Sequence, residues 1–383
     1  MCEAQHDPLH SRPMPAQNEI PLLVEQQSDL DKVCKVVAQH QQVAVDTEFV
    51  RTNTYAPHLG LLQLTAGEMT VCVDPLADVD MQEIWQLLFD PQRNSILHSA
   101  KQDMEVMWFG EGDVIHNLID TQVCAALPGY PAQIGYAGLL AELLNIEIAK
   151  SQTRTDWSRR PLTEAQLEYA AEDVIHLPEM LRLLEERLRE QGRYEWALED
   201  SSAMCNIALY KPEPTDAWQR IKSVPFLPPA QQARARALAT WREKRAVDSN
   251  KPRQWIIGDK ALLELVTENP ASEQAVQGLR ELPGGLARSQ GRKLLNILAA
   301  ANEGFAKGDI QIDQQEIDID REKALSKPMG KLVRATAEKL GIAAEVLASK
   351  RDINAIIRGT DNARALQGWR HDIVGEELLT LAN

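Results

Sequence analysis

The chain has few cysteines, no long apolar run and no Gly-rich phosphate-binding loop. Its cysteines are scattered without a CxxC pair, which excludes a zinc site or a disulfide framework and favours reduced thiols: Cys2, Cys34, Cys72, Cys124 and Cys205. No stretch approaches the roughly 20 apolar residues of a membrane helix, and the first residues lack the basic start and apolar core of a signal peptide. GxxxxGK[ST] and GxSxG motifs are absent, which disfavours a helicase fragment, a kinase and a nucleophile-elbow hydrolase. We therefore expect a cytoplasmic protein with no membrane partner.

The composition is otherwise typical of a globular protein, with 44% hydrophobic and 25% charged residues. A length of 383 residues corresponds to roughly two to four domains. The formal net charge of −15 argues against a nucleic-acid partner, but the charge is distributed unevenly. The net charge is −19 over residues 1–210, +6 over residues 211–300 and −2 over residues 301–383. This asymmetry indicates parts with different functions.

The pattern of hydrophobic residues divides the chain into four parts. We predict a mobile tail, an α/β domain and two small all-α domains, in this order: residues 1–18, 19–210, 211–300 and 301–383. The tail is rich in His, Pro and Gln and has no periodicity. Strand and helix patterns alternate in the second part, which is typical of an α/β domain, whereas the last two parts are helical. Pro212 and Pro214 mark a linker because they break a helix.

Two acidic residues interrupt an apolar strand pattern at residues 43–50. Residues two apart in a strand point to the same face, so Asp46 and Glu48 should project together. Two acids side by side in a buried strand repel each other unless a cation compensates them. The alternative is that they lie at a strand end, where water solvates them.

Three more residues extend this cluster. Asp103 opens a predicted helix directly after a short predicted strand at residues 95–99. Tyr169 and Asp173 are four apart in a long helical stretch and therefore share one helix face. Carboxylates from three segments could converge at one end of a sheet. Mg²⁺ and Mn²⁺ prefer such oxygen ligands, and a pair of ions would stabilise the entering and leaving oxygens of an attack on phosphorus.

In this order and spacing, three motifs resemble those of ribonuclease D, a family of the DEDD superfamily of 3′→5′ exonucleases. They are Val45-Asp46-Thr47-Glu48-Phe49, His98-Ser99-Ala100-Lys101-Gln102-Asp103-Met104-Glu105-Val106 and Tyr169-Ala170-Ala171-Glu172-Asp173-Val174. Trp241-Arg242-Glu243-Lys244-Arg245-Ala246 also resembles the HRDC domain, a small helical module. The resemblance implies a ribonuclease-H-like α/β exonuclease domain, with a mixed sheet and flanking helices, followed by two small all-α HRDC-type domains.

The resemblance also implies a role for each residue of the acidic cluster. Asp46, Glu48, Asp103 and Asp173 would hold two divalent metal ions, Mg²⁺ or Mn²⁺. Tyr169 would orient the attacking water, because the Tyr branch of the superfamily has a tyrosine four residues before its last aspartate. A phenol with an ordinary pKa near 10 is a poor base at neutral pH, so Tyr169 would not remove the proton itself.

Two basic clusters are candidate RNA contacts. The predicted contact residues are Arg154, Trp157, Arg242, Arg245, Lys251 and Arg253. In the cluster at residues 150–160, cations lie near Trp157, whose ring could stack on a base, and Arg154 is the preferred phosphate contact. In the cluster at residues 241–255, Lys and Arg lie near tryptophans. The alternatives are an ordinary polar loop and a solvated helix face.

We therefore predict a 3′→5′ exoribonuclease that hydrolyses single-stranded 3′ extensions of RNA and releases nucleoside 5′-monophosphates. The resemblance implies tRNA precursors as substrates. The alternatives are a DNA-directed proofreading or repair exonuclease and a catalytically silent RNA-binding scaffold. The metal site alone does not separate RNA from DNA, because that discrimination depends on contacts to the ribose 2′-OH. We expect a monomer, because the sequence has no coiled-coil seam.

Overall fold

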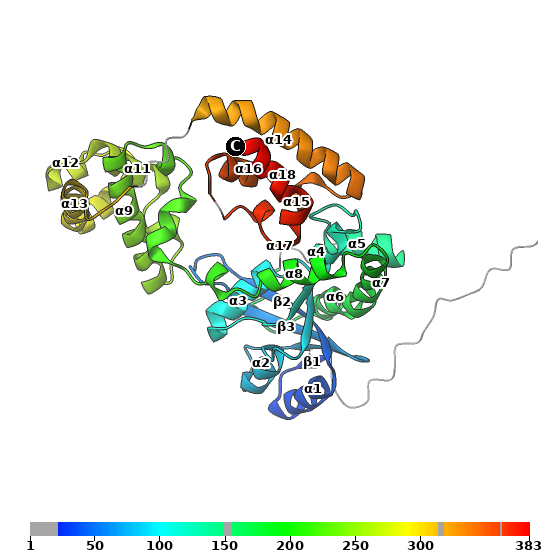
Figure 1. The fold of residues 1–383 in the computed structure, drawn as a ribbon. Helices are drawn as coiled ribbons and strands as arrows, with labels where there is room; N and C mark the ends of the chain where they lie inside the picture. Colours follow the sequence, from blue (N-terminus) through cyan, green and yellow to red (C-terminus); the bar gives the residue numbers. More distant parts are fainter. Residues whose placement is uncertain (1–21, 149–154, 313–317, 361) are drawn as a thin grey trace, which may run out of the picture. The chain divides into compact units, whose positions relative to one another are not determined.

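The computed structural model describes residues 22–148, 155–312, 318–360 and 362–383, which form two compact units (Figure 1). The first unit comprises the described part of Met1–Phe49 together with Leu59–Met104 and Val114–Cys205. The second comprises Val50–His58, Glu105–Asp113 and the described part of Asn206–Asn383. The predicted mobile tail at residues 1–18 lies outside the described residues. No helix within the described residues has the length and apolar character needed to cross a membrane.

The first unit is built on a six-stranded sheet with the strand order β1-β4-β3-β2-β5-β6. Its strands are β1 (Leu23–Val24), β2 (Gln42–Val50), β3 (His58–Ala66), β4 (Met69–Val73), β5 (Asn94–Leu97) and β6 (Leu118–Asp120). β3 and β4 are antiparallel, and their two-residue turn contains Gly67 at a φ of 58°, a conformation that favours glycine. β1 pairs with β4, and β5 with β2 and β6, in parallel. The sheet is therefore mixed, as the resemblance implies.

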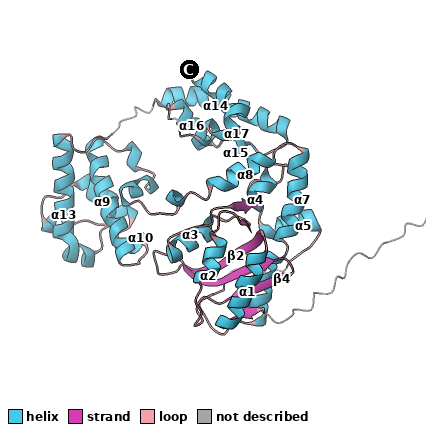
Figure 2. Ribbon diagram, turned by 60° about the horizontal axis from the view of Figure 1, so that its bottom comes forward, coloured by secondary structure: helices cyan, strands magenta, loops and turns pink. Residues whose placement is uncertain are grey.

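Helices flank this sheet, whose strands are drawn in magenta in Figure 2. They are α1 (Gln27–Gln39), α2 (Gln82–Leu88), α3 (Lys101–Glu111), α4 (Thr121–Ala126), α5 (Tyr136–Leu144), α6 (Glu164–Ile175), α7 (Leu177–Glu190) and α8 (Tyr194–Ala203). α6, α7 and α8 pack on β4, β5 and β6, respectively. Leu61, Leu62 and Leu64 of β3 are fully buried, so the centre of the sheet lies in the core. The predicted α/β fold is confirmed.

The second unit is helical. Its α-helices are α9 (Pro229–Asp248), α10 (Arg253–Ile256), α11 (Asp259–Glu268), α12 (Glu273–Gln277), α13 (Gly284–Lys307), α14 (Ile319–Leu340), α15 (Ala344–Leu347), α16 (Lys350–Ile357), α17 (Gly368–Arg370) and α18 (Glu376–Ala382). A short 3₁₀-helix, η2 (Pro214–Arg220), precedes them. Leu238 of α9, Leu265 of α11 and Leu294 of α13 share one apolar core. The predicted all-α character of the chain beyond the exonuclease-like part is confirmed.

Candidate active site

β2 carries the first two acids of the site. Val43, Ala44 and Val45 are fully buried, and the strand then continues through Asp46 and Glu48, which are partly buried. Burial raises the pKa of Glu48 to about 8, and the negative charges of Asp173 and Asp103 add to the effect. Burial also raises the pKa of Asp46, with further increases from Asp103, Asp173 and Glu48. The four carboxylates therefore lie close enough to repel one another.

A sharp turn places Asp103. β5 ends at Leu97, two residues earlier than the predicted strand, because Ser99 adopts a φ of 62° that a strand cannot accommodate. The backbone N–H of Ser99 donates a hydrogen bond to Asp120, and this turn leads directly into α3. Asp103 lies in the first turn of that helix and is only 6% exposed. Burial raises the pKa of its carboxyl to about 7, although hydrogen bonds from Thr47 lower it.

α6 supplies the last two residues of the cluster. A capping box between Thr163 and Gln166 begins the helix at Glu164, five residues before Tyr169. A hydrogen bond joins the side chains of Tyr169 and Asp173, as their spacing of one helical turn predicts. Burial raises the pKa of Asp173 to about 7, and the charge of Glu172 adds to this increase. The structure thus brings all five predicted residues into one cluster.

The four acids of this cluster offer the kind of donor that Mg²⁺ and Mn²⁺ prefer, because carboxylate oxygens are hard ligands. Within the described ranges, no group of three or more His, Cys, Asp and Glu side chains is arranged so that it could hold a metal ion as it stands. The charges of Asp103, Asp173 and Glu48 each raise the pKa of Asp46, so the carboxylates repel one another when no cation is bound. A divalent cation would neutralise that repulsion, so the residues fit such an ion chemically.

Thr47 is a residue of the site that the sequence analysis did not single out. Its Oγ1 donates a hydrogen bond of 2.5 Å to Oδ1 of Asp103, and both side chains are buried. The only signal in the sequence is its place between Asp46 and Glu48, which does not reveal a partner 56 residues away.

The structure does not support the role predicted for Trp157. Its side chain is only 3% exposed, stacks on the ring of Tyr169 at 6.3 Å between centroids, and lies against the backbone of Gly60. A buried ring cannot offer a face to an RNA base, so Trp157 supports Tyr169 instead. The predicted contact Arg154 lies outside the described residues.

Arg160 and Asp74 hold the segment that contains Trp157. The guanidinium of Arg160 forms an ion pair with Asp74 and donates hydrogen bonds to the carbonyl oxygens of Gly60 and Trp157. Asp74 is buried at the end of β4. This arginine of the first basic cluster therefore has a structural partner and is not a free surface cation.

The predicted RNA contacts of the second unit differ in exposure. Arg245 and Lys251 are exposed, as a phosphate contact requires. Arg242 is 2% exposed and donates hydrogen bonds to Asp259 and to the carbonyl oxygen of Ile257, so its prediction as a surface contact is wrong. Arg253 is partly buried and forms an ion pair with Glu243. The sequence shows the cations but not which of them the helices bury.

His98, which follows the predicted strand, packs inside the first unit. Its Nδ1 lies 2.9 Å from the hydroxyl of Thr121, and its Nε2 lies 3.1 Å from the carbonyl oxygen of Ile134. Burial lowers the pKa of this ring, which favours the neutral form. It serves to position the chain and is not among the groups of the acidic cluster.

Comparison with known proteins agrees with this geometry. Residues 21–189 match the family model of the 3′-5′ exonuclease domain. Residues 231–298 match the HRDC domain, and residues 322–378 match the C-terminal HRDC domain of ribonuclease D. Ribonuclease D of Granulibacter bethesdensis is 33% identical over 375 residues, which cover 95% of this chain and 93% of the relative.

The chain belongs to the ribonuclease D family. Ribonuclease D of Gluconacetobacter diazotrophicus is 35% identical over 94% of this chain and 92% of its own length. The crystal structure of Escherichia coli RNase D, described as an exoribonuclease involved in structured RNA processing, superimposes with a TM-score of 0.86 at 30% identity. That match covers 94% of this chain and 97% of the solved chain.

Membership of this family confirms the resemblance predicted from the three motifs. The protein is a 3′→5′ exoribonuclease with an α/β exonuclease domain and helical HRDC domains. RNA is therefore its class of substrate, and divalent metal ions are general cofactors of such exonucleases.

Proposed function

We propose that this ribonuclease D family member trims single-stranded 3′ extensions of tRNA precursors and releases nucleoside 5′-monophosphates. The observation that carries the proposal is the cluster of four mutually repelling carboxylates beside Tyr169. Such a cluster in a buried setting is costly for stability, which is typical of a site kept for its chemistry. The cytoplasmic location and the monomeric state stay predictions from the sequence.

In this proposal, Asp46, Glu48, Asp103 and Asp173 hold two divalent ions. When bound, two such ions neutralise the charge that develops on the attacking and leaving oxygens of the phosphodiester. Thr47 holds the carboxyl group of Asp103 in place through its hydroxyl hydrogen bond.

Tyr169 would orient the attacking water. Burial and the charge of Asp173 raise the pKa of its phenol above the ordinary value, so it keeps its proton at neutral pH. A protonated phenol can donate one hydrogen bond and accept another, but it cannot act as the base. The stacked ring of Trp157 fixes its orientation.

A time course on 5′-labelled tRNA with extra 3′ nucleotides, with Mg²⁺ or Mn²⁺ present, tests the proposal. The wild-type chain should give a ladder that shortens from the 3′ end, and Asp173→Asn should abolish it. Glu168→Gln is the matched control, because Glu168 lies on the same helix and is exposed. Shortening that survives Asp173→Asn would contradict the assigned site.

The DNA-directed alternative is tested by giving the wild-type chain a DNA strand of the same sequence. We expect faster hydrolysis of RNA, because the family is one of exoribonucleases. Equal rates on both strands would favour the alternative. RNA binding without release of mononucleotides would instead support the silent scaffold. Arg245 and Lys251 are the exposed cations that we propose as surface contacts of the RNA.

A further inference from the structure

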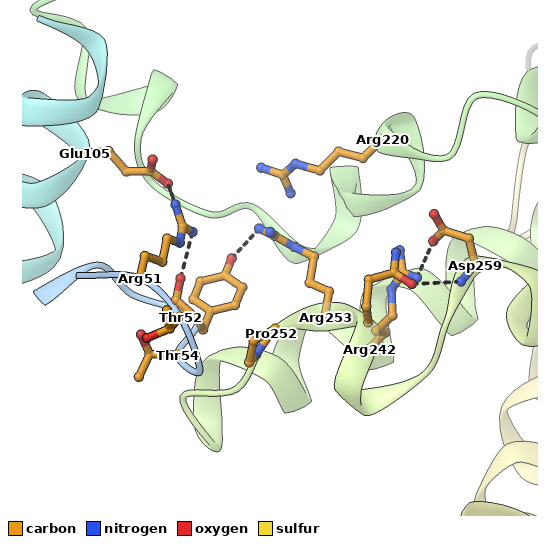
Figure 3. A pocket seen from close by; sticks show the side chains of 11 residues that line it. Arg51, Thr52, Thr54, Glu105, Arg220, Arg242, Pro252, Arg253 and Asp259 are labelled. Atoms are coloured by element: carbon orange, nitrogen blue, oxygen red, sulfur yellow. Dashed lines mark hydrogen bonds and ion pairs between the residues drawn. The ribbon is translucent and has the colours of Figure 1, made fainter. Parts of the chain in front are cut away.

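A cavity of about 550 Å³ in the second unit has a wall of arginines (Figure 3). Arg51 comes from the loop after β2, Arg220 from η2, Arg242 from α9 and Arg253 from α10. All of them belong to the second compact unit. None of the roles assigned above requires a cavity at this place.

The cavity holds more positive than negative charge. Arg51 forms an ion pair with Glu105 at 3.0 Å, and Arg242 forms one with Asp259 at 2.5 Å. The remaining two guanidinium groups, those of Arg220 and Arg253, share one carboxylate, Glu243. Four cations thus face three anions, and an additional anion would complete the balance.

Arg220 is the group best placed to receive that anion. Its side chain is 54% exposed, and its contact with Glu243 is a single one of 3.2 Å. Figure 3 shows the guanidinium groups of Arg220 and Arg253 directed toward the same open space, with the pair of Arg51 and Glu105 on its other side. Guanidinium groups present paired N–H donors that match the oxygens of a phosphate.

Hydrogen bonds hold the side of the cavity that contains Arg253, and a preorganised side chain lowers the entropic cost of binding. Glu243 is fully buried and accepts two hydrogen bonds from Arg253 and one from the hydroxyl of Tyr55. The side chain of Asn250 accepts hydrogen bonds from the backbone N–H groups of Tyr55 and Ala56. Arg253 is therefore held in place before a ligand arrives.

We propose that this cavity binds a backbone phosphate of the RNA substrate, an inference that rests on the proposed function. Arg51 follows Glu48 by three residues, so their Cα atoms lie at most about 11 Å apart along the chain. Glu105 likewise follows Asp103 by two residues. Two residues that line the cavity are therefore joined by short stretches of chain to residues of the acidic cluster. RNA is favoured over an acidic peptide because the family acts on RNA, which offers a phosphate at every nucleotide.

Binding of a labelled single-stranded RNA of about 12 nucleotides to the full chain, with Asp173→Asn present in every variant to prevent hydrolysis, tests this proposal. Arg220→Ala should weaken binding about fivefold at low salt. The logarithm of the association constant for RNA falls linearly with the logarithm of the salt concentration, and the slope of this line should become less steep by about 0.7 in the variant. Arg292→Ala is the matched control, because that arginine is 83% exposed and lies outside the cavity. Equal effects of the two variants would overturn the proposal.

Asp259→Asn should change the affinity for RNA in the direction opposite to Arg220→Ala. It removes a negative charge from the cavity and keeps an oxygen that can accept the hydrogen bond from Arg242. RNA binding should become tighter, whereas a purely structural role of Asp259 predicts no change or weaker binding. Tighter binding by Asp259→Asn with weaker binding by Arg220→Ala supports the proposal, and any other combination overturns it.

Two further measurements separate the possible sources of failure. If the cavity takes the phosphate of a free nucleoside 5′-monophosphate, Arg220→Ala will weaken binding of that nucleotide as much as binding of RNA. For a backbone phosphate, only the RNA is affected. In the otherwise wild-type chain, the loss of activity on Arg220→Ala should grow with the length of the RNA. If the wild-type chain shortens no RNA at all, the proposed function fails, whatever the binding data show.

Discussion

Thr47 and Asp103 are joined by a buried hydrogen bond of 2.5 Å, although 56 residues separate them in the sequence. The bond connects the strand that carries Asp46 and Glu48 with the helix that carries Asp103. It therefore fixes the relative position of two of the three segments that form the acidic cluster. Thr47 acts through Asp103 and is a positioning residue.

Thr47→Val keeps the volume of the side chain and removes the donor. We expect the free energy of unfolding to fall by about 1–3 kcal/mol, because the buried carboxyl group of Asp103 loses the hydrogen bond that the Thr47 hydroxyl donates. We also expect kcat to fall about tenfold, as a misplaced group in a site can cost that much or more. Thr47→Ser retains the hydroxyl and should restore most of both quantities, as measured by urea unfolding and RNA hydrolysis. Equal losses in both variants would contradict the positioning role.

Trp157→Ala should destabilise the first unit by about 3–5 kcal/mol, because it removes a large buried ring. The same variant should lower kcat, since Tyr169 loses the ring on which it stacks. Thermal unfolding and steady-state kinetics measure the two effects. A rise in KM without any loss of stability would instead restore the predicted role in stacking on a base.

Gly60→Ala and Gly110→Ala should have opposite effects on stability. A Cβ at Gly60 would lie 2.7 Å from the carbonyl oxygen of Trp157, so the backbone must shift, and we expect a loss of about 1–3 kcal/mol. A Cβ at Gly110 in α3 would meet no atom within 4 Å, and we expect a gain of about 0.5–1 kcal/mol. Urea unfolding of both variants shows whether each substitution lowers or raises the free energy of unfolding. If both variants changed the free energy of unfolding by the same amount, the backbone near Gly60 would have shifted away from the new Cβ without loss of stability.

The ion pair of Asp74 and Arg160 should make stability depend on pH. Burial alone would raise the pKa of Asp74, but hydrogen bonds from Arg160 and from backbone N–H groups lower it below its usual value. The stabilisation is therefore complete above the unfolded-state pKa near 3.9 and is lost as the pH falls through the lower folded-state value. Asp74→Asn should cost about 2 kcal/mol near neutral pH and much less at about pH 3.

Urea unfolding at both pH values measures this difference. Asp78→Asn is the control, because Asp78 is exposed and only four residues away. A destabilisation by Asp74→Asn that is the same at both pH values would show that the charge of Asp74 contributes nothing.

The acidic cluster could be predicted because local periodicity places its members. Asp46 and Glu48 are two apart in a strand, and Tyr169 and Asp173 are four apart in a helix, so each pair shares a face wherever the segment lies. The expectation that these segments lie together in space came from the family resemblance. Whether they do so depends on the order of the strands in the sheet, and a short sequence pattern does not encode that order.

The basic residues were harder to assign, because the same guanidinium can face water or a buried carboxylate. Arg242 and Arg245 are three residues apart on α9, yet one is buried and the other exposed. Tyr55 binds Glu243 across 188 residues, and this contact groups the loop after β2 with the second unit. Such partners depend on tertiary packing, and the sequence around each residue carries no sign of them.

The proposed catalytic groups also span a long part of the chain, with Asp46 near its start and Asp173 after α5. No shorter stretch contains the complete acidic cluster, so a partly synthesised protein has nothing with which to cleave RNA. A nascent chain must release residue 173 from the ribosome, and fold α6 onto the sheet, before it becomes a nuclease.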